Sequence, residues 1–134
     1  MDIKKEKVLC QKQWAKNKYL VLSYSSKIYL EIRTYLKQAE VSLEKVDKLI
    51  KQAINLPEDK GQVTNALHHV WGYFKKFATK EEKDNFFELI EDYHINKTTK
   101  EDLIEEVKKL LEKYPNTYLE QSTFINGGKD ETLA

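Results

Sequence analysis

The stretch from Val63 to Phe77, VTNALHHVWGYFKKF, decides the fold class. Its large apolar residues recur at alternating intervals of four and three, the spacing that places side chains on one face of an α-helix. They are Val63, Leu67, Val70, Phe74 and Phe77. This stripe predicts an amphipathic helix that buries its apolar face in a core.

The same periodicity extends upstream of this stretch. It predicts helices over residues 3–22, 26–38 and 43–53. Ser25 and Ser42 precede the second and third of these segments, where a hydroxyl can accept a hydrogen bond from the first helical turn. We therefore expect both serines to be N-caps.

The downstream half shows the same helical pattern. Thr79 is placed to cap a helix that Asn96 ends in the left-handed conformation. Thr98 and Glu101 have the spacing of a capping box, which predicts the start of the next helix. A last short helix is expected over residues 115–124.

Length and composition complete the fold prediction. The chain has 134 residues, which is the size of one domain. It contains only 4 Gly and 2 Pro, and a loop-rich β-sandwich or barrel would need more of both for its turns. No segment alternates apolar and polar residues over the length of a strand. We predict an all-α protein, a single compact bundle of five to seven helices with short connections. It should span residues 1–125, followed by a flexible tail over residues 126–134.

The single cysteine and the short apolar runs exclude several classes of protein. Cys10 alone cannot form an internal disulfide or a cysteine-ligated zinc or iron–sulfur site. The longest apolar run, Tyr19 to Leu22, is far shorter than the ~20 residues that span a bilayer. The N-terminus shows no secretory signal. We expect a cytoplasmic protein with no membrane association.

The net charge of +1 conceals an asymmetry along the chain. Residues 1–80 carry 16 basic and 8 acidic side chains, and residues 81–134 carry 7 and 14. The halves therefore have net charges of +8 and −7. Such a split indicates an anionic partner for the basic half, or mutual attraction of the two halves within the fold. Arg33 is the one arginine among the basic residues, so it alone can provide a planar fork for phosphate.

Two groups of residues are candidates for binding RNA or another ligand. On the first helix the candidates are Trp14, Lys16, Asn17 and Lys18, followed by Tyr19. Alternation of basic and aromatic residues is typical of proteins that recognise single-stranded or loop RNA. On the helix that contains the opening stretch the candidates are Asn65, His68, Trp71, Lys75 and Lys76. These side chains can stack on a base and hold a phosphate. Gly72 interrupts the same helix and suggests the close approach of a ligand or another helix.

No motif for catalysis or metal binding is present. His68 and His69 are adjacent on a predicted helix, so their side chains point about 100° apart and cannot share one metal ion. There is no Gly-x-Ser-x-Gly motif and no glycine-rich phosphate loop. We therefore predict no cofactor, no metal and no catalytic residue.

Three motifs carry a family resemblance. Residues 14–23 (WAKNKYLVLS), residues 56–61 (LPEDKG) with residues 65–76 (NALHHVWGYFKK), and residues 114–122 (YPNTYLEQS) resemble the opening, central and closing motifs of the YbgA-like domains. The resemblance spans about residues 8–124. This bacterial family is classed as of unknown function, and its members occur alone or fused behind a desulfurase-like domain.

The resemblance implies a role with RNA. In the fusions it implies removal of sulfur from thiolated uracil, with transfer RNA as the substrate. The desulfurase domain carries the iron–sulfur chemistry and the YbgA-like part helps to hold the RNA. Because this chain has one cysteine and no such domain, we expect a non-catalytic, RNA-binding accessory protein that acts in trans with a desulfurase-like partner or as a stand-alone binder.

Two other classes of function remain open at this point. One is a small enzyme or small-ligand-binding protein that uses His68 as an acid–base group, with a pocket walled by Trp71 and Tyr73. The other is a protein-interaction module, which would expose an apolar patch. A concave pocket at His68 would favour the enzyme, and a flat basic face would favour RNA binding.

Overall fold

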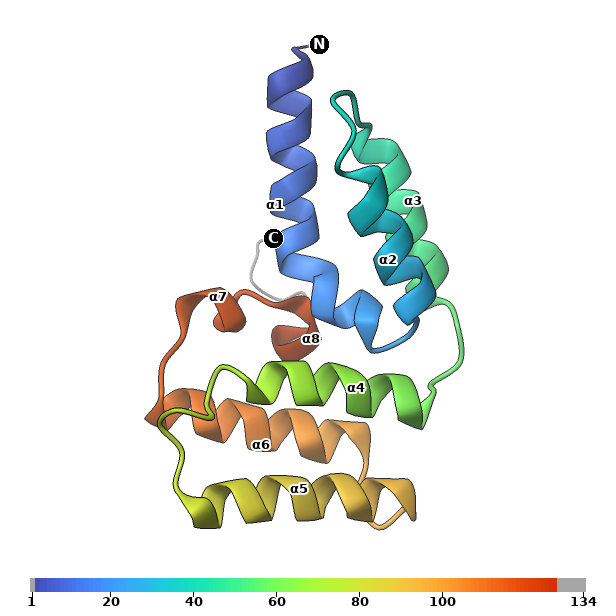
Figure 1. Ribbon diagram of the computed structural model, residues 1–134. Helices are drawn as coiled ribbons and strands as arrows, with labels where there is room; N and C mark the ends of the chain where they lie inside the picture. Colours follow the sequence, from blue (N-terminus) through green and yellow to red (C-terminus); the bar gives the residue numbers. More distant parts are fainter. Residues whose placement is uncertain (1, 128–134) are drawn as a thin grey trace.

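The computed structural model describes residues 2–127, and every regular element in that range is an α-helix (Figure 1). The six longer helices are α1 (Ile3–Leu22), α2 (Ser26–Tyr35), α3 (Leu43–Ile54), α4 (Lys60–Trp71), α5 (Lys80–His94) and α6 (Lys100–Lys113). Two single-turn helices follow, α7 (Thr117–Glu120) and α8 (Thr123–Asn126). The all-α prediction is confirmed. None of the described helices is both long and apolar enough to cross a bilayer.

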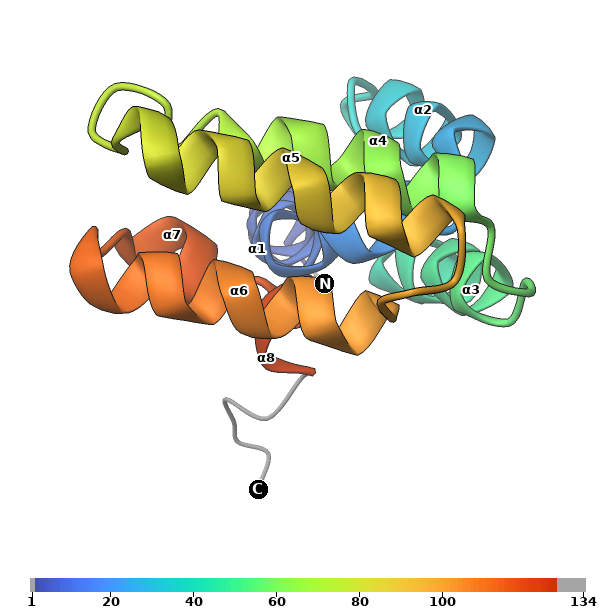
Figure 2. The same ribbon diagram turned by 90° about the horizontal axis from the view of Figure 1, so that it is seen from below.

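The helices form two groups that share α1. The first part of α1 packs with α2 and α3, while α4, α5 and α6 cross below its C-terminal end (Figures 1 and 2). The single-turn helix α8 lies between α1 and α6 and contacts both. Each group therefore has its own set of buried side chains.

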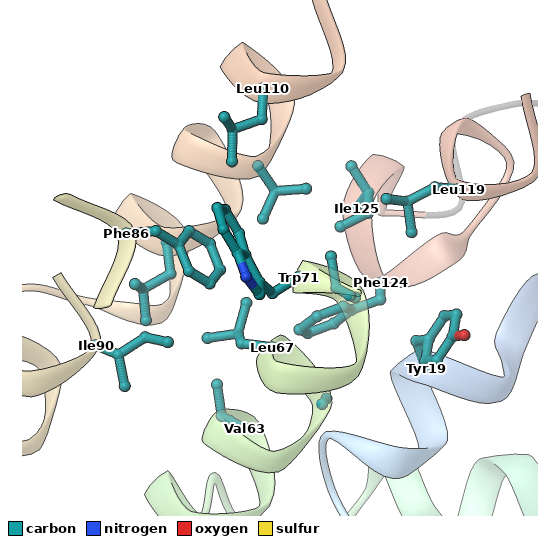
Figure 3. Close-up of a cluster of buried hydrophobic side chains, with 14 of the residues drawn as sticks. Tyr19, Val63, Leu67, Trp71, Phe86, Ile90, Leu110, Leu119, Phe124 and Ile125 are labelled. Atoms are coloured by element: carbon teal, nitrogen blue, oxygen red, sulfur yellow. The ribbon is translucent and has the colours of Figure 1, made fainter. Parts of the chain in front are cut away.

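The smaller core is that of α1, α2 and α3. Its buried residues are Cys10, Val21, Ile32, Leu36, Val41, Val46, Leu49, Ile50 and Ala53. The larger core lies among α1 and α4 to α8, around Trp71 (Figure 3). The sequence had indicated one core. Two form because α1, with 20 residues and a length of about 30 Å, extends beyond one layer of helices. Tyr19 and Leu22 enter the larger core, whereas Cys10 and Val21 enter the smaller one.

Most of the predicted helix caps are present. Ser25 Oγ accepts from Ile28 N at 3.0 Å, and Ser42 Oγ accepts from Lys45 N at 3.3 Å. Thr79 caps α5 and forms a reciprocal capping box with Glu82. Asn96 has a φ of 64°, in the left-handed region expected for it. These local predictions are confirmed.

The capping box of α6 was predicted one residue too early. Thr99 and Asp102 form it, instead of Thr98 and Glu101. Both pairs have the required spacing of three, so spacing alone cannot choose between them. The Thr98 hydroxyl is used elsewhere, because it donates to the carbonyl of Leu89 at 2.9 Å.

The helix that contains the opening stretch ends earlier than its apolar spacing predicts. It stops at Trp71, and Gly72 is its C-cap rather than an interior residue. The chain continues in tight turns, with Tyr73 N bonded to Val70 O and Phe74 N to Trp71 O. The predicted core position of Phe77 is wrong: this side chain is 66% exposed, because the helical register ends before it.

The C-terminal segment also differs from the prediction. The single helix expected over 115–124 is divided into α7, capped by Asn116, and α8, capped by Ser122. Asn126 still belongs to α8, and Gly127 ends that helix with a φ of 68°. The rest of the expected tail, residues 128–134, lies outside the described residues.

Candidate nucleic-acid interface

Two candidates on α1 are committed to internal packing. The indole of Trp14 is half-buried, with its centroid 5.3 Å from that of Tyr29 on α2. Asn17 is 8% exposed: its Nδ2 donates to Gln13 O, and its Oδ1 accepts from Thr123 Oγ1, each at 2.8 Å. These side chains join α1 to α2 and to α8. They are therefore not free to contact a ligand through those groups.

Lys18 is held between two aromatic rings. Its Nζ lies 5.3 Å from the ring centroid of Tyr19 and 5.3 Å from that of Tyr118 on α7. A cation at this distance is attracted to the face of an aromatic ring. Lys18 is half-buried, as is its neighbour Lys16. The Lys18 ammonium is therefore placed where α1 meets α7.

Tyr73 completes this contact from a third part of the chain. Its hydroxyl oxygen is 2.8 Å from that of Tyr19, and its ring stacks with that of Tyr118, with centroids 6.1 Å apart and 24° between planes. Tyr73 belongs to the turns that follow α4, and so do the exposed Lys75 and Lys76. The structure thus brings Lys18 to the segment that carries the other two lysines.

A second pair of rings lies in the same two segments. Phe77 stacks with Tyr114, with centroids 6.3 Å apart and 23° between planes. Phe77 comes four residues after Tyr73, and Tyr114 comes four residues before Tyr118. We call these four residues the aromatic edge. Sequence reasoning missed Phe77, Tyr114 and Tyr118 as site residues, although the two equal spacings were a signal that could have indicated them.

A carboxylate and an ammonium group pair at the end of the aromatic edge formed by Phe77 and Tyr114. Glu82 accepts from Lys113 Nζ at 2.9 Å and from the Tyr114 hydroxyl at 2.7 Å. The backbone hydrogen bond from Thr79 is the main cause that lowers the pKa of Glu82 to about 2, followed by these two side-chain bonds. Glu82 therefore offsets the charge of Lys113. Lys18 lies at the other end, beside Tyr118, and the exposed Lys75 and Lys76 lie between Tyr73 and Phe77 in the chain.

The α4 candidates divide between the core and the surface. Trp71 is 6% exposed, and its ring stacks on Phe86 with centroids 5.1 Å apart (Figure 3). His68 and Asn65 are exposed. The Phe87 ring lies 5.3 Å from that of His68 and 5.6 Å from that of Trp71.

This packing corrects the expectation that Trp71 faces a ligand. The interval of four that links Val63, Leu67 and Trp71 places the indole on the core side of α4. Phe87 occupies the space between Trp71 and His68, where a ligand pocket would have to form.

Arg33 is not part of the same surface. It is exposed in the last turn of α2, which runs away from α4 toward the N-terminal end of α1 (Figure 1). The loop that follows α2 lies beside that end, because Lys7 Nζ donates to Gln38 O at 2.7 Å. Arg33 therefore lies apart from the segment that carries Lys75 and Lys76.

The ion pairs show how the charge asymmetry is arranged in space. Within residues 2–127 the ion pairs are Lys80–Asp84, Lys108–Glu105 and Lys113–Glu82. All of them lie within α5 and α6. In the described part of the chain, the acidic helices therefore do not pair directly with Lys16, Lys18, Lys75 or Lys76. Nor do three or more His, Cys, Asp or Glu side chains of these residues form a group that could hold a metal ion.

The fold and this surface define a small all-helical protein with an exposed aromatic and basic edge. The sequence profile described as "Protein of unknown function (DUF1722)" matches residues 18–127, and the chain belongs to this family. The match includes Lys18 and the whole aromatic edge, and begins after Trp14 and Lys16. Comparisons with curated proteins and with solved structures gave no significant match.

Proposed function

We propose that this protein is a non-catalytic RNA-binding domain with transfer RNA as its ligand, and that it acts in trans with a desulfurase-like partner in thiouridine metabolism. The observation that carries the RNA-binding part is the position of Lys18. It lies between two tyrosine rings, next to the segment that contains Lys75 and Lys76, and it has no carboxylate partner among the described ion pairs.

The charges of this region suit a phosphate backbone. Lysine attracts phosphate as a point charge, and each contact releases counterions, so binding weakens as salt is added. Residues 1–80 have a net charge of +8 and include all four lysines of the proposed surface. Because the ion pairs of the described residues lie in α5 and α6, these lysines remain available to an external anion.

The choice of transfer RNA and of a desulfurase-like partner rests on the resemblance to the YbgA-like domains. Three of the stretches that carry this resemblance meet at the proposed surface. Residues 14–23 provide Lys18 and Tyr19, residues 65–76 provide Tyr73 and two lysines, and residues 114–122 provide Tyr114 and Tyr118. Their hydrogen bond and ring contacts place all three stretches at one edge of the molecule.

A binding titration with a charge-matched control tests the RNA-binding function. Retention of bulk transfer RNA would be measured on a filter at about 50 mM and about 200 mM salt. We expect binding at the lower concentration that weakens steeply at the higher one. Replacing Lys16, Lys18, Lys75 and Lys76 together by Glu should abolish binding and leave the helical circular dichroism unchanged.

The control variant carries the same change of net charge on other surfaces. It replaces the exposed Lys27, Lys37, Lys48 and Lys51 by Glu. We expect it to retain most of the affinity. Equal losses in the two variants would show that total charge, and not this surface, governs binding. Absence of transfer RNA binding at low salt would refute the proposed function.

The partner requires a separate measurement. A purified desulfurase-like protein would be tested for desulfuration of thiolated transfer RNA with and without this chain. We expect the chain to lower the KM for the RNA and the four-lysine variant to have no effect. An unchanged KM would remove the partner from the proposal and leave RNA binding intact.

A further inference from the structure

We propose that the aromatic edge binds unpaired nucleotides, with bases stacked on Phe77 and Tyr118 and with the neighbouring phosphates on Lys18, Lys75 and Lys76. This inference rests on the RNA-binding function proposed above and specifies the form of RNA that is bound. It also moves the stacking role to two exposed rings. Trp14 is half-buried against the smaller core, and Trp71 is buried in the larger one.

Phe77 is an unusual phenylalanine in this chain. Phe74 and Phe86 are fully buried, Phe124 is 3% exposed, and Phe87 is half-buried against the core. Phe77 is 66% exposed. Its contact with Tyr114 fixes the orientation of the ring, so a base that stacks on it does not have to order a mobile side chain.

The ring of Tyr118 lies next to the ammonium group of Lys18. The Tyr118 side chain is 36% exposed, and it is supported by the stacked ring of Tyr73. The Lys18 ammonium lies 5.3 Å from its centroid. A base that stacks at Tyr118 would therefore carry its phosphate close to a positive charge.

The rings favour unpaired RNA over a duplex. In an A-form helix the base faces are covered by their neighbours, and proteins bind it through phosphates and 2′-hydroxyls. Lysines alone would serve either form of RNA. An exposed phenylalanine offers a duplex no favourable contact, but it can stack with the free face of any unpaired base.

The experiment compares two RNA probes by fluorescence anisotropy at low salt. One is a labelled oligouridine of about 12 nucleotides, and the other is an RNA duplex of similar length. We expect Phe77→Ala and Tyr118→Ala each to weaken oligouridine binding about tenfold and to leave duplex binding unchanged. Because both side chains are exposed, circular dichroism should show both variants folded.

Conservative and control variants separate stacking from general apolar contact. Phe77→Tyr should retain oligouridine binding, whereas Phe77→Leu should lose it, because leucine has no aromatic face. Ile95→Ala removes an apolar side chain that is 62% exposed elsewhere, and it should have no effect. Wild-type affinity in Phe77→Leu would overturn the inference and indicate that Phe77 contacts an apolar surface of a protein.

The outcomes distinguish failure of this inference from failure of the proposed function. If Phe77→Ala and Tyr118→Ala bind oligouridine as tightly as the wild type while the four-lysine variant does not, the inference is wrong and RNA binding stands. If neither probe nor transfer RNA binds at low salt, both are wrong.

Discussion

The hydroxyl oxygens of Tyr19 and Tyr73 lie 2.8 Å apart, although the two residues are 54 positions apart in the chain. The rings meet edge to face, with centroids 6.0 Å apart. Burial, and then the hydrogen bond to Tyr73, raise the pKa of Tyr19 well above its ordinary value of 10.0. The pair joins α1 to the turns after α4, and it thereby positions Lys18 beside the aromatic edge.

Loss of this hydrogen bond should destabilise the protein in a non-additive way. We expect Tyr19→Phe and Tyr73→Phe each to lower the free energy of unfolding by about 1 kcal/mol, because each leaves a partner hydroxyl unsatisfied. The double variant should cost less than the sum of the two, since both hydroxyls are then absent. Urea unfolding of the three variants measures this coupling. Additive costs would show that the two hydroxyls contribute independently.

Trp71 should be important for stability and not for RNA binding. Trp71→Ala removes a ring that stacks on Phe86 in the larger core, and a substitution of this kind costs about 3–5 kcal/mol. Trp71→Phe keeps an aromatic ring and should cost less. The phenylalanine variant should therefore remain folded and bind transfer RNA with unchanged affinity. A large loss of affinity in this folded variant would restore Trp71 to the binding surface.

The acid stability of the protein should depend on Glu82. Its pKa is lowered from 4.5 to about 2 in the folded state, chiefly by the backbone hydrogen bond from Thr79. A carboxylate with a lowered folded-state pKa stabilises the fold above its unfolded pKa, and this contribution is lost as the pH falls from 4.5 to about 2.

Glu82→Gln should therefore lower the midpoint of thermal unfolding near about pH 6, and the difference from the wild type should shrink as the pH approaches 2. The amide oxygen of Gln can still accept the bond from Thr79, which isolates the effect of the charge. A difference that stays constant over this pH range would contradict the assignment.

One hydroxyl group forms a hydrogen bond between α8 and α1. Thr123 Oγ1 lies 2.8 Å from Asn17 Oδ1 and 3.2 Å from Lys16 O. Thr123→Val keeps the shape of the side chain and removes the donor. Because Asn17 is 8% exposed, its oxygen would lose its partner with little access to water. We expect a loss of about 1–3 kcal/mol in the free energy of unfolding, and Thr123→Ser should retain most of the stability.

The helices and their caps were predictable because they depend on residues close together in the sequence. Ser25, Ser42 and Thr79 each bond to a backbone group three residues away. The end of α4 was less predictable, because the apolar stripe continues through Gly72 while the helix does not. The buried position of Trp71 was available from its intervals to Val63 and Leu67.

The candidate surface could be predicted only in part. Lys18, Lys75 and Lys76 were identified from the sequence, but their proximity depends on contacts between distant segments. Tyr73 meets Tyr118 through the packing of the C-terminal segment, in which α8 contacts α1 and α7 contacts α8, and nothing local specifies that packing. The exposure of Phe77 likewise follows from the early end of α4. Sequence periodicity predicts which face of a helix is apolar, but not which distant segment covers that face.

The packing of α8 on α1 also bears on how this chain folds during synthesis. Thr123 and Asn17 are 106 positions apart, yet a hydrogen bond between them joins α8 to α1. The smaller core uses residues 10–53 and can assemble while the ribosome is still translating the rest. The C-terminal end of α1 packs against α4 and also against α8, whose residues are translated later. Lys18 can meet Tyr118 only after that residue has been translated, and a chain that stops before Tyr118 would lack one of the two rings beside Lys18.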